Sequence, residues 1–78
     1  MSSRFGKYRV LTPEFCMGEA IGRLSNIGGW LDGQSKENDL VAILARVPIH
    51  SMPAYEHWLI EQSAGSGRVV FEGECEDP

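Results

Sequence analysis

The stretch Arg4-Phe5-Gly6-Lys7-Tyr8-Arg9-Val10-Leu11-Thr12-Pro13-Glu14 decides the fold, because a strand pattern runs directly into a helix start. From Arg4 to Leu11, basic and apolar residues alternate with a period of two, which is typical of a half-buried β-strand. Thr12 is a candidate N-cap, Pro13 suits the first helical position and Glu14 suits the positive end of the helix dipole. The sequence therefore predicts a strand followed at once by a helix.

The rest of the chain predicts one more helix and three more strands. The first helix presents one apolar face and ends at Gly28-Gly29, with a left-handed C-cap. We then expect a short strand at 30–32, a polar hairpin loop at 33–39, a strand at 40–47, a helix at about 52–63 and a strand at 68–72. This order predicts the α+β class, as a ferredoxin-like βαββαβ sandwich whose four-stranded antiparallel sheet carries both helices on one face.

The length and charge of the chain limit which classes of protein and which partners are plausible. The 78 residues predict a single domain, 1–78, with an acidic tail at 72–78. The tail holds four of the eleven acidic residues, so the body has seven acids against seven bases, which does not favour DNA. The longest apolar run, Leu40 to Ala45, is too short to span a membrane, and the N-terminus lacks a signal-peptide pattern. We expect a cytoplasmic protein whose Cys16 and Cys75 are not bonded to each other.

Spaced matches in both halves of the chain resemble the C-terminal domain of elongation factor G, the family's domain V. The matches are Thr12-Pro13-Glu14, Met17-Gly18, Ile21-Gly22-Arg23-Leu24, Gly29, Gly33, Val47-Pro48-Ile49, Met52, Tyr55, Leu59, Gly67-Arg68 and Phe71. The resemblance extends from about Tyr8 to Glu74. It implies a ferredoxin-like domain that docks on the large ribosomal subunit near the factor-binding site. No Gly-x-x-x-x-Gly-Lys-Ser/Thr motif occurs in the chain, so we do not expect GTP hydrolysis.

The candidate binding site is the sheet face that the helices leave open. Strand alternation predicts one set of side chains under the helices: Tyr8, Val10, Val41, Ile43, Ala45, Val47, Val69 and Phe71. The open face then includes the residues that we expect to bind a partner, namely Trp30, Leu44, Arg46, Lys7, Arg9 and Val70. Glu72 and Glu74 are also expected there, whereas Leu31 is expected to be buried. Exposed apolar side chains among arginines are typical of an interaction site.

The residues that could act in catalysis or bind a metal are better explained as core or surface side chains. His57 and Glu61 are four residues apart on the second predicted helix, but no third metal ligand has a matching spacing. Cys16 follows a helix start, which can activate a thiol, but its helical phase favours a packed side chain. We therefore expect no catalytic residue, no metal and no cofactor.

The sequence thus predicts a non-catalytic, stand-alone binding module linked to translation. Its expected partner is a protein that contacts the open sheet face, and the ribosome is one candidate. Two alternatives use the same fold: a homo-oligomerising module that pairs through the open face or an edge strand, and a small-ligand sensor.

Overall fold

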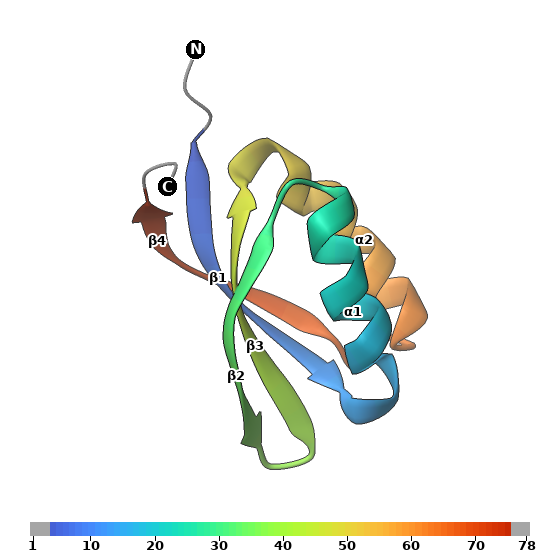
Figure 1. Ribbon diagram of the computed structural model, residues 1–78. Coiled ribbons are helices and arrows are strands. Elements are labelled where there is room, and N and C mark those ends of the chain that lie inside the picture. The colour runs from blue at the N-terminus through green and yellow to red at the C-terminus, as the bar shows by residue number, and fades with distance from the viewer. Residues whose placement is uncertain (1–3, 76–78) are drawn as a thin grey trace.

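A computed structural model describes residues 4–75 as one sheet covered by two helices. The elements are β1 (Phe5–Pro13), α1 (Glu14–Asn26), β2 (Trp30–Glu37), β3 (Leu40–Pro48), a short 3₁₀ turn (Ile49–Ser51), α2 (Met52–Gln62) and β4 (Arg68–Cys75). The strand order is β2-β3-β1-β4, and every neighbouring pair is antiparallel. Both helices lie on the same face of the sheet (Figure 1). The predicted ferredoxin-like α+β fold is confirmed.

The core lies between the helices and the inner side of the sheet. The inward side chains of β1 and β3 alternate with outward ones, as the strand period predicted, and α1 and α2 contribute their buried stripes. The fully buried cluster comprises Tyr8, Val10, Ala20, Leu24, Val41, Ile43, Ala45, Val47, Met52, Tyr55 and Leu59. Because this core occupies only the helix side, the opposite side of the sheet, which we call the outer face, is free of helices (Figure 1).

The two ends of α1 are built differently from each other. The expected N-cap is wrong: Thr12 still belongs to β1, is fully buried and turns its hydroxyl to the carbonyl of Pro13, while Pro13 takes the N-cap position. At the other end Gly28 has φ +80°, and the N–H groups of Gly28 and Gly29 donate to the carbonyls of Ser25 and Leu24. This is a Schellman arrangement, so the predicted left-handed C-cap is confirmed.

The hairpin between β2 and β3 is tighter than the sequence predicted. Residues 33–37, expected in a polar loop, continue β2 and pair with β3 up to Glu37 opposite Leu40. Only Asn38 and Asp39 form the turn, and Asn38 takes a positive φ of 55°. Polar residues suit this strand because it lies at an edge of the sheet, where cross-strand hydrogen bonding outweighs weak strand propensity.

Strand β4 is longer than expected and contains a bulge. It continues to Cys75, so residues 72–75 of the expected acidic tail belong to the sheet, while 76–78 lie outside the described residues. The register with β1 shifts at the bulge, where Lys7 pairs with Gly73 and Tyr8 with Phe71. The extra residue reverses the alternation beyond it, which places Glu74 opposite Gly6 on the helix side. The expected outward position of Glu74 is therefore wrong.

Two apolar residues expected in the core lie at its margin instead. Phe71 keeps the predicted side of the sheet and packs on the Tyr8 ring at 5.4 Å between centroids, but it is 55% exposed. Leu31 is 39% exposed. Both residues belong to the edge strands β4 and β2, so the helices cover them incompletely.

Both cysteines are free, as predicted. Cys16 is buried in α1 and its thiol donates to the carbonyl of Gln62 at the end of α2. Within residues 4–75, neither helix has the length and apolar character needed to cross a membrane.

Candidate functional site

The outer face brings together all six residues that the sequence assigned to partner binding. Cross-strand pairing places them in two adjacent rows, because directly opposite residues of antiparallel strands point to the same side. One row runs across β2, β3 and β1 through Trp30, Arg46 and Lys7, and the next runs across β3, β1 and β4 through Leu44, Arg9 and Val70.

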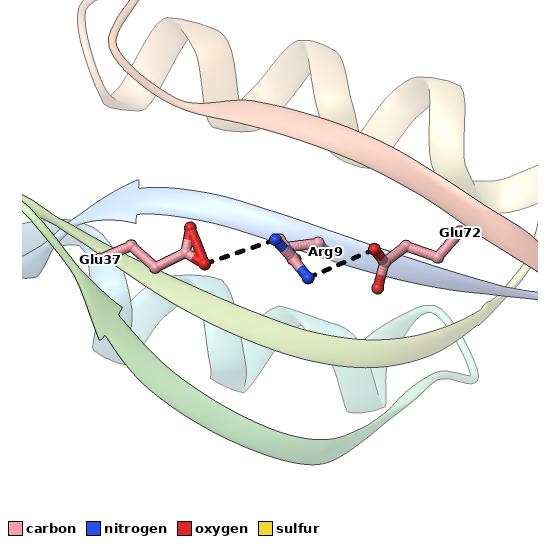
Figure 2. Close-up of polar contacts among 3 residues, drawn as sticks. All are labelled: Arg9, Glu37 and Glu72. Carbon is pink, nitrogen blue, oxygen red and sulfur yellow. Dashed lines mark hydrogen bonds and ion pairs between the residues drawn. The ribbon is translucent and has the colours of Figure 1, made fainter.

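Arg9 occupies the middle of the outer face and is held from both sides. Figure 2 shows its guanidinium between the carboxylates of Glu37 on β2 and Glu72 on β4, with N–O distances of 3.4 and 3.5 Å. Its Nε is buried and has no hydrogen-bond partner within residues 4–75. Since all three side chains are about 40% exposed, each pair contributes only about 0–1 kcal/mol. The pairs chiefly fix where the guanidinium lies.

Apolar side chains border Arg9 on both sides. Leu44 is 37% exposed and Val70 is 41% exposed, and each lies directly opposite Arg9 on its neighbouring strand. A partly exposed leucine and valine on either side of an ordered arginine have the composition typical of a protein interface. We call Leu44, Arg9 and Val70 the central row.

In the row of Trp30, Arg46 and Lys7, the Trp30 side chain packs against its neighbours Phe5 and Arg46. The indole ring of Trp30 lies 5.2 Å from the ring of the buried Phe5, and the Arg46 guanidinium lies 5.9 Å from the indole. Arg46 also donates to the Asp32 carboxylate at 2.7 Å. Trp30 thus points outward beside Arg46, as predicted, but it is half-buried rather than freely exposed.

The outer face is electrically balanced rather than basic. Asp32, Glu37 and Glu72 neutralise the two arginines, and Lys7 forms no ion pair within the described part of the chain. The sequence placed Glu72 on this face but missed Asp32 and Glu37. Reading Asn38-Asp39 as a two-residue turn would have placed Glu37 on this face, but the bulge that positions Asp32 leaves no such signal.

The ionisable side chains on the helix side of the sheet form an exposed ion pair or pack in the core. His57 and Glu61 form a 2.9 Å pair on α2, with both side chains well exposed, and residues 4–75 contain no cluster of three His, Cys, Asp or Glu suited to a metal. Burial raises the pKa of Tyr55 to about 12, partly offset by Arg23, and its hydroxyl donates to the carbonyl of Ala20. Burial, with help from Glu56 and Glu74, also raises the pKa of Tyr8.

Comparison with known proteins supports the resemblance seen in the sequence. The chain is 33% identical over 72 residues to elongation factor G of Ruegeria sp. (strain TM1040) and 38% identical over 65 residues to that of Ruegeria pomeroyi. These matches cover 92% and 83% of this chain. The chain spans only about a tenth of the length of these relatives, 10% and 9% respectively. No protein-family model matches.

A solved structure agrees in fold. The chain superposes on a crystal structure of ttk003000868 from Thermus thermophilus with a TM-score of 0.77 and 24% sequence identity. The match covers 99% of this chain and 12% of the Thermus chain. With the curated relatives, it shows that this chain is a ferredoxin-like α+β domain similar to the C-terminal domain of elongation factor G.

Proposed function

We propose that this chain is a non-catalytic binding module of the cytoplasmic translation machinery, and that it binds a protein partner through the outer face of its sheet. The similarity to elongation factor G supports the link to translation, and the ribosome is the first partner to test. The observation that carries the choice of surface is the central row, in which Leu44 and Val70 stay partly exposed beside an ordered Arg9.

Charge favours a protein over RNA as the partner of this face. Three carboxylates, Asp32, Glu37 and Glu72, balance the basic side chains Lys7, Arg9 and Arg46, and both arginines are already paired. A phosphate backbone would have to compete with these carboxylates and would meet their negative charge. A protein surface can instead cover Leu44 and Val70 without displacing the carboxylates that pair with Arg9.

The chemistry of the side chains supports a non-catalytic role. The buried Cys16 thiol donates to a main-chain carbonyl, and the exposed His57 pairs with its helical neighbour Glu61. A small-ligand sensor on the same face is the weaker alternative, because the side chains of the central row lie on the exposed surface of the sheet.

Co-sedimentation with purified ribosomes tests the proposal. Leu44→Glu should weaken binding by about tenfold or more, because it places a charge at the centre of the interface. The matched control is Ile60→Glu on α2, since Ile60 is 42% exposed and Leu44 is 37% exposed. Circular dichroism should show both variants folded. Between about 50 and 200 mM salt, binding by the outer face should change little, whereas contacts to RNA phosphates would weaken it steeply.

Three outcomes would contradict the proposal. Absence of co-sedimentation would remove the ribosome as partner. Equal weakening by the Leu44 and Ile60 variants would remove the outer face as the binding surface. A steep loss of binding with salt would identify RNA rather than protein as the contact.

A further inference from the structure

Among residues 4–75, none pairs with the outer edge of β4. β4 ends the strand order and pairs only with β1, and within residues 4–75 no loop or turn donates a backbone hydrogen bond to it. The free N–H and C=O groups of such an edge can pair with another strand.

The two edges of the sheet differ in how well they are protected. β2 is interrupted by a bulge next to Gly33 and carries Lys36, and both features discourage pairing with another strand. The bulge in β4 lies at Glu72, the last residue of the segment Arg68–Glu72, so the register with β1 is continuous from Arg68 to Phe71. The segment contains neither glycine nor proline. The segment 68–72 is therefore the edge best suited to accept a strand.

The sequence of this segment is complementary to itself. If a second copy of 68–72 runs antiparallel with a two-fold axis at Val70, Arg68 lies opposite Glu72 of the second copy, and Val69 lies opposite Phe71. Arg68, Val70 and Glu72 share the outer face, so opposite charges meet at both ends of that row. Val69 and Phe71 share the helix side, where the pairing is apolar.

Exposure of the same residues supports this pairing. Val70 is 41% exposed and Phe71 is 55% exposed, although both are large apolar side chains. Arg68 is exposed and forms no ion pair within the described residues, whereas Glu72 contacts Arg9. Pairing of the two segments covers the apolar side chains and gives each Arg68 a carboxylate.

We propose that two copies of this chain associate through antiparallel pairing of β4, centred on Val70, into one continuous sheet of eight strands. A two-fold axis perpendicular to the sheet keeps all four helices on one side and joins the two outer faces. Because only five residues of each copy pair, the dimer is weak, with a Kd in about the micromolar to millimolar range. The proposal goes beyond the binding role above and does not depend on it.

A charge exchange tests both the contact and its register. Arg68→Glu and Glu72→Arg should each weaken self-association by about tenfold, because two like-charged pairs replace two opposite-charged pairs. An equimolar mixture of the two single variants should form a heterodimer, since each end again joins opposite charges. The double variant Arg68→Glu/Glu72→Arg should regain the wild-type Kd. Sedimentation equilibrium up to about 1 mM protein measures the first and last results, and native mass spectrometry identifies the heterodimer.

Matched controls distinguish this pairing from association through the β2 edge and from another register of β4. Lys36→Glu on the β2 edge should leave the dimer unchanged. Glu74→Arg should also leave it unchanged, because Glu74 would face Arg68 only in a register centred on Phe71. A wild-type chain that stays monomeric at about 1 mM overturns the proposal. So does a dimer that Lys36→Glu or Glu74→Arg disrupts, or failure of the two single variants to join each other.

Discussion

Replacing Trp30 by alanine should lower the free energy of unfolding by about 2–3 kcal/mol. Stacking on Phe5, with centroids 5.2 Å apart, contributes about 0.5–1.5 kcal/mol. The Arg46 guanidinium, 5.9 Å from the indole, adds about 0.5 kcal/mol at this long distance. Loss of the half-buried indole surface contributes about 1 kcal/mol more. A Trp30 exposed beside Arg46 without a packing partner would cost less than about 1 kcal/mol when replaced, so the packing on Phe5 makes the difference.

Urea unfolding followed by far-ultraviolet circular dichroism measures this loss, and the midpoint of thermal unfolding should fall by about 8–24 °C. Trp30→Phe is the matched control, because it keeps a ring against Phe5 and should cost less than about 1 kcal/mol. Partner binding should also weaken in Trp30→Ala, since the indole borders the central row. A loss below about 1 kcal/mol in the alanine variant, or equal losses in both variants, would refute the packing argument.

Three further predictions test the extent of the core, the close approach of Gly29 to β3 and the pH dependence of the free energy of unfolding. Leu24→Ala, at 1% exposure, should cost about 2–5 kcal/mol, whereas Phe71→Ala, at 55%, should cost about 1 kcal/mol; equal costs in urea unfolding would contradict the observed core. Gly29→Ala should cost about 1–3 kcal/mol, because its Cβ would lie 2.8 Å from the Arg46 carbonyl oxygen; unchanged stability would contradict that close approach. The raised pKa of Tyr55 stabilises the fold below pH 10 and loses that effect as pH rises toward 12. Unfolding free energy should therefore fall by roughly 2–3 kcal/mol more in wild type than in Tyr55→Phe, and parallel curves would contradict the pKa shift.

Local sequence patterns were sufficient for the element order and most of the core. Alternation in 4–11 and 40–47 fixed the inward sides of β1 and β3, and the helical spacing of Met52, Tyr55 and Leu59 matched their burial. The glycine pair at 28–29 marked the end of α1 for a physical reason, since the Schellman turn needs a positive φ.

The errors arose where tertiary pairing overrides local preference. The segment 33–37 looks like a loop because its residues are polar, but pairing with β3 makes it a strand. The β4 bulge turns Glu74 to the helix side, opposite Gly6. Period-two alternation cannot reveal an inserted residue, so neither the place of Asp32 on the outer face nor the inward turn of Glu74 could be predicted.

The central claim is that the outer face of the sheet contacts a protein partner on the ribosome. Site-specific photo-crosslinking tests it most directly. A benzophenone amino acid is placed at Leu44 on β3 or at Ile60 on α2, which are similarly exposed, and each variant is irradiated with purified ribosomes. The account predicts a crosslink to a ribosomal protein from position 44 and none from position 60. A crosslink from position 60 alone, or from position 44 to ribosomal RNA, would contradict it.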